Sequence, residues 1–338
     1  MTYKFLLVAR QSLGLLREIA YIRGGEKLLY MISRRMIRVK VMQTLYSLET
    51  QDSQISPPDA IKLLQKQFDL SRRLIVYLIH FITEVARYSE TDARNKASKH
   101  LPSATDLRVN TKIAGNELLW KILEHPSFVQ AVREDKPQLE EDADLVKKIY
   151  QNLASSEKYI QYTTTLSRDR KNEKEILEYI LTDLMLPDER FIGFIEERFP
   201  NWDDDADMTV QLVTGFLAKP AGFDFAELLG QDKWIFAREL LRTTMEKKEV
   251  TLEWIRPRLK NWDADRIAVL DMLLMRMGVC EFLFFETIPP KVTINEYIDL
   301  AKAYSTEQSG HFINGILDNI HKDLVRDDKM HKVSFKAP

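Results

Sequence analysis

The chain has 338 residues, 45% of them hydrophobic and 30% charged, and this composition excludes a wholly disordered protein. Its formal net charge is −2, so any attraction to a polyanion must come from a local cluster of cations. The single cysteine, Cys280, excludes an internal disulfide framework and agrees with a cytoplasmic location. With only 11 glycines and 12 prolines among many Leu, Ile, Lys and Glu residues, the sequence favours an all-α fold.

Residues 1–30 differ from the rest of the chain. Their apolar run 5–9 is short and is followed by Arg10 and Arg17, which favours neither a signal peptide nor a membrane anchor. Every pattern used below begins after Met31. The hypothesis is that the natural chain starts at Met31 and that 1–30 is an upstream extension, and an intact mass that includes 1–30 would reject it.

Residues 33–48 predict the first amphipathic helix. Ser33 is a plausible N-cap, and the segment 51–59, with its prolines, ends the helix. Apolar side chains recur at helical spacing and predict a buried stripe: Ile37, Val41, Thr44, Leu45 and Leu48.

The start of this helix carries four cations within about two turns and no acid between residues 31 and 48. At about 100° per residue, Arg34 and Arg38 lie nearly above each other with Arg35 beside them, so we expect these arginines to point outward. Cations at a helix N-terminus are disfavoured by about 0.3–1 kcal/mol each, and an anionic ligand would offset that cost. The alternative is a solvated charged face. The cluster consists of Arg34, Arg35, Arg38 and Lys40.

Further helical patterns follow in chain order. Residues 59–88 predict two helices joined at 68–70, and 93–106 predict a polar loop. The segments 201–205 and 261–265 both begin Asn-Trp-Asp, which indicates either two similar helix starts or a true repeat. The next predicted helices are 112–123, 145–153, 174–184, 187–198 and 207–217, with a break at 218–224.

The last third of the chain predicts a core helix over 263–284, the most apolar of all, with Cys280 as a small core residue. Ser305 and Gln308 have capping-box spacing before the last helix. The other helices predicted here are 232–247, 252–259, 292–304 and 307–324.

No enzyme motif is recognisable. The sequence has no Walker A loop, no GxGxxG and no GxSxG elbow, and its six histidines show no metal-ligand spacing. His80 and Glu84 lie four residues apart and indicate a surface pair. We therefore expect a non-enzymatic protein with no cofactor and no metal.

From Asp232 onward the chain resembles the NusB family. The strings carrying this likeness are IPPKVTINE at 288–296, DLAKAYSTE at 299–307 and FINGILD at 312–318. The helix start at 34–46 is similar to the arginine-rich first helix of the family. Within the motif, Val292, Ile294, Ile298 and Ala301 read as core, Gly315 as close helix packing, and Asn295 and Asn314 as structural hydrogen-bonding groups.

The resemblance implies a NusB-like helical bundle of two subdomains, its N-terminal part enlarged by a helical insert. The implied divisions are a possible extension 1–30, the first helix 31–50, an insert 51–225 of unknown role, the C-terminal helical domain 226–325 and a basic tail 326–338. Oligomeric state is left open.

The resemblance also implies a function. A NusB protein pairs with NusE, a small-subunit ribosomal protein, binds boxA-type single-stranded RNA of ribosomal RNA leaders, and acts in the RNA polymerase antitermination complex. The implied partner-binding residues are Tyr46, Asp265 and Asp271. The implied RNA-binding residues are Arg34, Arg35, Arg38, Lys40, Gln308 and Phe312.

Two questions stay open at this point, the role of Phe312 and the functional class of the chain. Phe312 either stacks on an unpaired base or packs in the core. The chain is either an RNA-binding antitermination factor or a protein-interaction scaffold of the transcription complex with little RNA affinity of its own. A cryptic enzyme is the third class, and no motif supports it.

Overall fold

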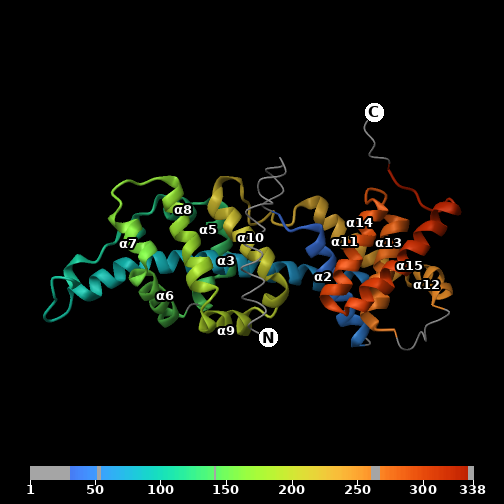
Figure 1. The fold of residues 1–338 in the computed structure, drawn as a ribbon, viewed down its shortest axis with the longest axis horizontal. Helices are drawn as coiled ribbons and strands as arrows, with labels where there is room; N and C mark the ends of the chain where they lie inside the picture. Colours follow the sequence, from blue (N-terminus) through green and yellow to red (C-terminus); the bar gives the residue numbers. More distant parts are fainter. Residues whose placement is uncertain (1–30, 52–54, 141, 260–266, 334–338) are drawn as a thin grey trace. The chain divides into compact units, whose positions relative to one another are not determined.

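The computed structural model describes residues 31–51, 55–140, 142–259 and 267–333. All regular structure within these ranges is helical, which confirms the all-α prediction (Figure 1). These residues form two compact units. The split unit contains 32–68 and the chain from Leu229 onward, and the inner unit contains 69–228. The predicted extension 1–30 lies outside the described residues.

The split unit is a bundle around α13 (Val269–Phe284), which contacts the five other helices named below. α13 has buried residues on all sides, and Cys280 is fully buried in it, as predicted for the core helix. The surrounding helices are α2 (Arg34–Thr50), α11 (Gln231–Glu246), α12 (Lys248–Ile255), α14 (Pro290–Tyr304) and α15 (Glu307–Arg326).

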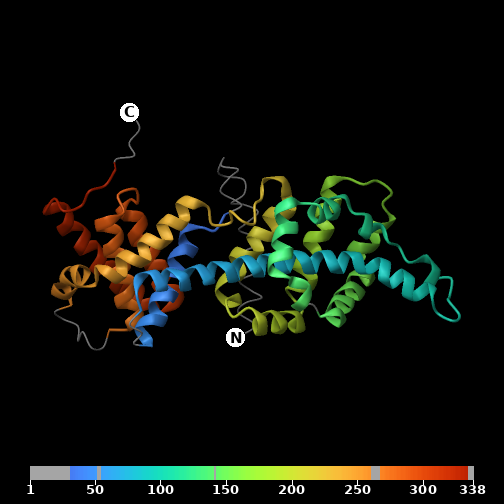
Figure 2. The same ribbon diagram turned by 180° about the vertical axis from the view of Figure 1, so that it is seen from behind.

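Helix α3 (Pro57–Ala97) is one uninterrupted helix of 41 residues (Figure 2). The predicted joint at 68–70 is therefore wrong, and so is a loop beginning at residue 93. The physical reason is that no glycine or proline occurs between Pro58 and Pro102, so nothing stops the helix once it has formed. Residues 57–68 belong to the split unit and the rest of α3 to the inner unit.

The inner unit packs around the middle of α3. Ile79 and Ile82 are fully buried there, and the ring of Phe81 meets that of Phe191 with centroids 4.9 Å apart. A π-helical turn, Ile180–Met185, follows α8 directly. The helices of this unit are α4 (Glu117–Leu123), α5 (Pro126–Asp135), α6 (Ala143–Ser155), α7 (Glu157–Thr164), α8 (Arg170–Tyr179), α9 (Glu189–Arg198) and α10 (Trp202–Ala218). Short 3-10 helices cover Asp106–Arg108, Lys112–Gly115, Pro137–Glu140 and Pro220–Gly222, and Arg256–Arg258 in the split unit.

Part of the C-terminal motif faces outward. Ala301 is buried as predicted, but Val292 is 43% exposed and Asn295 and Asn314 are exposed, so their predicted packing roles are wrong. A Cβ on Gly315 would meet nothing within 4 Å, so close packing at that position is also wrong. The reason is that α14 and α15 each bury one stripe and leave the opposite face to solvent.

Close packing occurs instead at Gly278 and Gly310. A Cβ on Gly278 would lie 3.0 Å from Leu317, and one on Gly310 would lie 2.9 Å from the Lys302 side chain and 3.5 Å from the Ile298 carbonyl oxygen. These two glycines let α15 approach α13 and α14 closely, which fixes the position of the first turns of α15.

Candidate nucleic-acid interface

The first turn of α2 presents two cations to solvent. Ser33 caps the helix as predicted, because its Oγ accepts a hydrogen bond from the Met36 backbone N–H at 3.2 Å. Arg34 and Arg35 follow, both exposed, and this turn contains no acid. Arg35 lies 3.6 Å from Asp299 of α14, but both side chains are largely exposed, so this ion pair contributes little to stability. Two guanidinium groups therefore stand at the positive end of the helix dipole.

Arg38 does not point outward as predicted. It is 1% exposed, and its Nε and Nη2 donate to the two carboxylate oxygens of Glu281 at 2.7 and 3.0 Å. The physical reason is its register, since Arg38 precedes Val41, Met42 and Leu45 by three, four and seven residues and so shares their buried face. The buried surface of α2 is wider than the predicted stripe.

The carboxylate of Glu281 collects two more donors. The Thr293 hydroxyl donates to it at 3.0 Å and the Tyr297 hydroxyl at 2.8 Å. The Arg38 guanidinium also lies 3.4 Å from Glu296 and 5.5 Å from the Phe236 ring centre. This network ties α2, α13 and α14 together beneath the exposed cations.

The charges of this network stabilise one another. Burial alone would lower the pKa of Arg38, but the charge of Glu281 and its hydrogen bonds outweigh burial and raise that pKa. Burial and the charge of Glu281 together raise the pKa of Tyr297 well above its ordinary value. Arg38 therefore stays a cation and Tyr297 a neutral hydrogen-bond donor at every physiological pH.

Lys40, the fourth cation of the predicted cluster, is also buried, with 0% exposure. It follows Ile37 by three residues and precedes Thr44 by four, which places it on the predicted stripe itself. Of the four predicted cations, the structure exposes Arg34 and Arg35.

The start of α15 carries the other two predicted RNA-binding residues. Gln308 is exposed and Phe312 is half-buried. The cap is Thr306, whose Oγ1 accepts from the Ser309 backbone N–H at 3.0 Å, so the predicted capping pair of Ser305 and Gln308 is wrong by one residue. α14 contacts both the first turn of α2 and α15, because its Asp299 pairs with Arg35 and the helix packs along α15.

The predicted partner-binding residues have different surroundings. Tyr46 is 42% exposed on α2. Asp271 is only 7% exposed and accepts a hydrogen bond from the Ser309 hydroxyl at 2.8 Å, so it supports the start of α15 from below. Asp265 lies outside the described residues. Partner contact at these positions stays a prediction.

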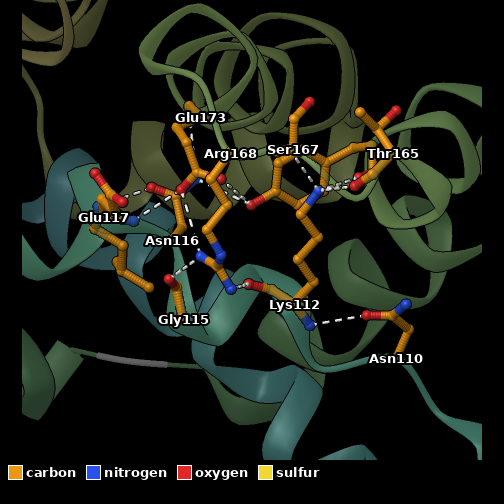
Figure 3. Close-up of polar contacts among 11 residues, drawn as sticks. Asn110, Lys112, Gly115, Asn116, Glu117, Thr165, Ser167, Arg168 and Glu173 are labelled. Atoms are coloured by element: carbon orange, nitrogen blue, oxygen red, sulfur yellow. Dashed lines mark hydrogen bonds and ion pairs between the residues drawn. The ribbon is translucent and has the colours of Figure 1, made fainter.

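A second polar cluster lies in the inner unit (Figure 3). Lys112 donates from Nζ to the carbonyl oxygens of Tyr162, at 2.7 Å, and Thr165. The same ammonium lies 4.5 Å from the Tyr162 ring centre. Arg168 donates to the carbonyl oxygen of Gly115. Both cations are thus engaged by the chain's own backbone.

Glu173 closes this cluster from α8. It is 2% exposed and accepts from the Glu117 backbone N–H at 2.7 Å and from the Tyr162 hydroxyl at 2.9 Å. Asn116 donates to the Glu173 carbonyl oxygen at 2.9 Å. These hydrogen bonds therefore join the start of α4 to the α7–α8 segment.

A metal site, a reactive thiol and a membrane-spanning helix are three other features to look for among the described residues. The described residues contain no group of His, Cys, Asp and Glu side chains that could hold a metal ion. Burial raises the pKa of the Cys280 thiol to about 12, so the thiol stays protonated. Among the described helices, none has the length and apolar character needed to cross a membrane.

Sequence reasoning missed two features of this region. Glu281 was not singled out, although an acid inside the most apolar helix signals a buried counter-charge. Phe284 lies at the end of the same apolar run and is 42% exposed. Val269, at the other end of this helix, is 45% exposed, and nothing in the apolar run itself separates its buried members from its exposed ones.

Comparison with known proteins finds similarity to one family in the C-terminal part of the chain. The NusB family profile matches residues 211–322. A "Transcription antitermination protein NusB" of Methylacidiphilum infernorum (isolate V4) is 44% identical over 104 residues, which cover 31% of this chain and 72% of the relative. The protein of the same name from Salinibacter ruber (strain DSM 13855 / M31) is 43% identical over 97 residues, covering 29% of this chain and 61% of the relative.

A third relative with this name, from Chloroherpeton thalassium (strain ATCC 35110 / GB-78), is 44% identical over 72 residues, covering 21% of this chain and 34% of the relative. No solved structure matches the chain.

Proposed function

The chain belongs to the NusB family, since it is 44% identical to a NusB protein over 72% of that protein's length, and we propose that it acts as an RNA-binding transcription antitermination factor. We propose further that it binds boxA-like RNA of ribosomal RNA leaders together with NusE, within the RNA polymerase antitermination complex.

The observation that carries this proposal is the exposed pair Arg34 and Arg35. Both lie on the first turn of α2, and the Arg38–Glu281 ion pair holds the next turn of this helix in the bundle. Guanidinium groups bind phosphate oxygens and base edges with two parallel hydrogen bonds. A fixed helix start with two outward guanidinium groups and no acid in its first turn suits a single-stranded polyanion.

The test is binding of a boxA-like single-stranded RNA, measured by fluorescence anisotropy over a range of salt concentrations, with and without NusE. The double variant Arg34→Ala/Arg35→Ala should bind more weakly. The slope of log affinity against log salt is negative, and its magnitude should decrease by about 0.7 for each phosphate that the variant no longer binds.

A matched control removes two exposed arginines elsewhere in the split unit. Arg256 and Arg326 are 61% and 69% exposed, so Arg256→Ala/Arg326→Ala changes the net charge equally. The proposal requires that this control keep the wild-type slope. An equal decrease in both double variants would mean that net charge alone governs binding.

A second candidate function is a protein-interaction scaffold with little RNA affinity of its own. The inner unit favours it, because Trp120, Ile160 and Leu166 are exposed by 51%, 51% and 98%. Affinity capture from lysate with and without nuclease separates the two functions. Partners that survive nuclease and no longer bind the Trp120→Ala variant would favour the scaffold.

A further inference from the structure

A groove opens beside Arg34 in the split unit. It encloses about 500 Å³ between α11 and the C-terminal end of α13 with the turn that follows. Arg34 lines one part of it, and Phe236, Phe284 and Phe285 supply aromatic surface. A volume of this order accommodates a small planar group.

Two of these aromatic side chains connect to the cation, and the third lines the same groove. The Arg34 guanidinium lies 5.5 Å from the ring centre of Phe236. The rings of Phe236 and Phe285 meet edge to face with centroids 5.5 Å apart. Phe284 lines the same groove and is 42% exposed. A solvent-facing aromatic surface therefore adjoins a cation of the proposed RNA interface.

The charges around the groove favour a nucleobase over a phosphate backbone. Four acids border the groove, Asp232, Glu239, Glu246 and Glu286, and they outnumber its three cations, Arg34, Arg242 and Lys247; Arg242 is paired with Glu239. These acids repel phosphates. They do not repel an uncharged base, and a carboxylate accepts hydrogen bonds from the amino group of cytosine.

We propose that Phe284 is a stacking platform for one unpaired base of the bound RNA, next to the phosphate that Arg34 holds. This inference rests on the proposed function. Stacking on an aromatic ring is tolerant of base identity and contributes about 1–3 kcal/mol per base. The platform extends the interface from α2 toward the end of α13.

The test compares Phe284→Leu with Phe284→Tyr in the full chain. Leu keeps apolar bulk but has no π face, so it should weaken binding of the boxA-like RNA by about 5- to 150-fold. Tyr keeps the ring and should bind as the wild type does. Neither change should alter the salt slope, because every bound phosphate keeps its cation.

A second measurement changes the RNA and combines that change with the protein variant. A series of the same RNA, each with one abasic ribose, should contain a position that weakens wild-type binding as Phe284→Leu does. That RNA should bind the Leu variant with little further decrease in affinity, since both changes remove the same stacking interaction. Binding that depends on Arg34 and Arg35 but not on Phe284 or on any abasic position would overturn the platform and leave the proposed function standing. Failure of the wild type to bind RNA would overturn both.

Discussion

Arg38 and Glu281 form an ion pair with both side chains removed from water, at 2% and 0% side-chain exposure. Removing one partner strands the other charge in the interior, which costs about 3–5 kcal/mol. We predict that Arg38→Ala lowers the free energy of unfolding by that amount, measured by urea denaturation and by faster hydrogen exchange of α13 amides. The double variant Arg38→Met/Glu281→Leu should regain only part of this stability, because it leaves neither charge of the pair buried but removes the acceptor of the Thr293 and Tyr297 hydroxyls. An Arg38→Ala variant as stable as the wild type would contradict this prediction.

Lys332 makes stability depend on pH in the alkaline range. Its Nζ donates to the carbonyl oxygens of Glu281 and Phe285, each at 2.7 Å, and burial lowers the pKa of Lys332 from 10.5 to about 8 despite the nearby acids. Between these two pH values the folded chain binds fewer protons than the unfolded chain, so this lysine's destabilising effect is full below pH 8 and disappears toward pH 10.5. We predict that the melting temperature of the wild type rises relative to that of Lys332→Met across this window. A constant or falling difference would show that the ammonium is not desolvated.

The continuity of α3 gives a prediction for a whole element. Lys66 is exposed within the described part of this helix, just before the expected joint. Proline there would remove a backbone hydrogen bond and clash with the preceding turn, so Lys66→Pro should cost about 3 kcal/mol or more. Lys66→Ala should be neutral or slightly stabilising. Thermal unfolding followed by circular dichroism distinguishes the two variants. A Lys66→Pro variant as stable as the wild type would favour the joint at 68–70 that the sequence predicts.

Elements with strong local signals could be predicted from the sequence. The predicted helices 232–247, 292–304 and 307–324 differ from α11, α14 and α15 by two residues or fewer at each end. Residue environments that depend on distant parts of the chain could not be predicted in this way. The burial of Arg38 depends on Glu281, which lies 243 positions further along the sequence. A cation's local spacing carries no information about such a partner.

At the scale of the molecule, the family match and the compact units divide the chain differently. The profile match begins at residue 211, inside α10, whereas the split unit resumes at Leu229. The insert 51–225 stays a prediction; within that range, residues 57–68 belong to the split unit, and Leu64 and Phe68 are buried. The candidate interface lies wholly in the split unit, so the inner unit, residues 69–228, is the segment to remove when testing what the interface needs.

Such a deletion leaves ends at Phe68 and Leu229, and the ring of Phe68 meets that of Trp234, five residues after Leu229, with centroids 6.2 Å apart. A flexible Gly/Ser linker of about eight residues spans about 15 Å, which is enough to join them. We predict that the chain with this linker in place of 69–228 folds and binds the boxA-like RNA with less than a tenfold decrease in affinity, about 1.4 kcal/mol. Arg34→Ala/Arg35→Ala should weaken binding in the shortened chain as it does in the full chain. A shortened chain that is helical and melts cooperatively but no longer binds RNA would place part of the interface in the inner unit.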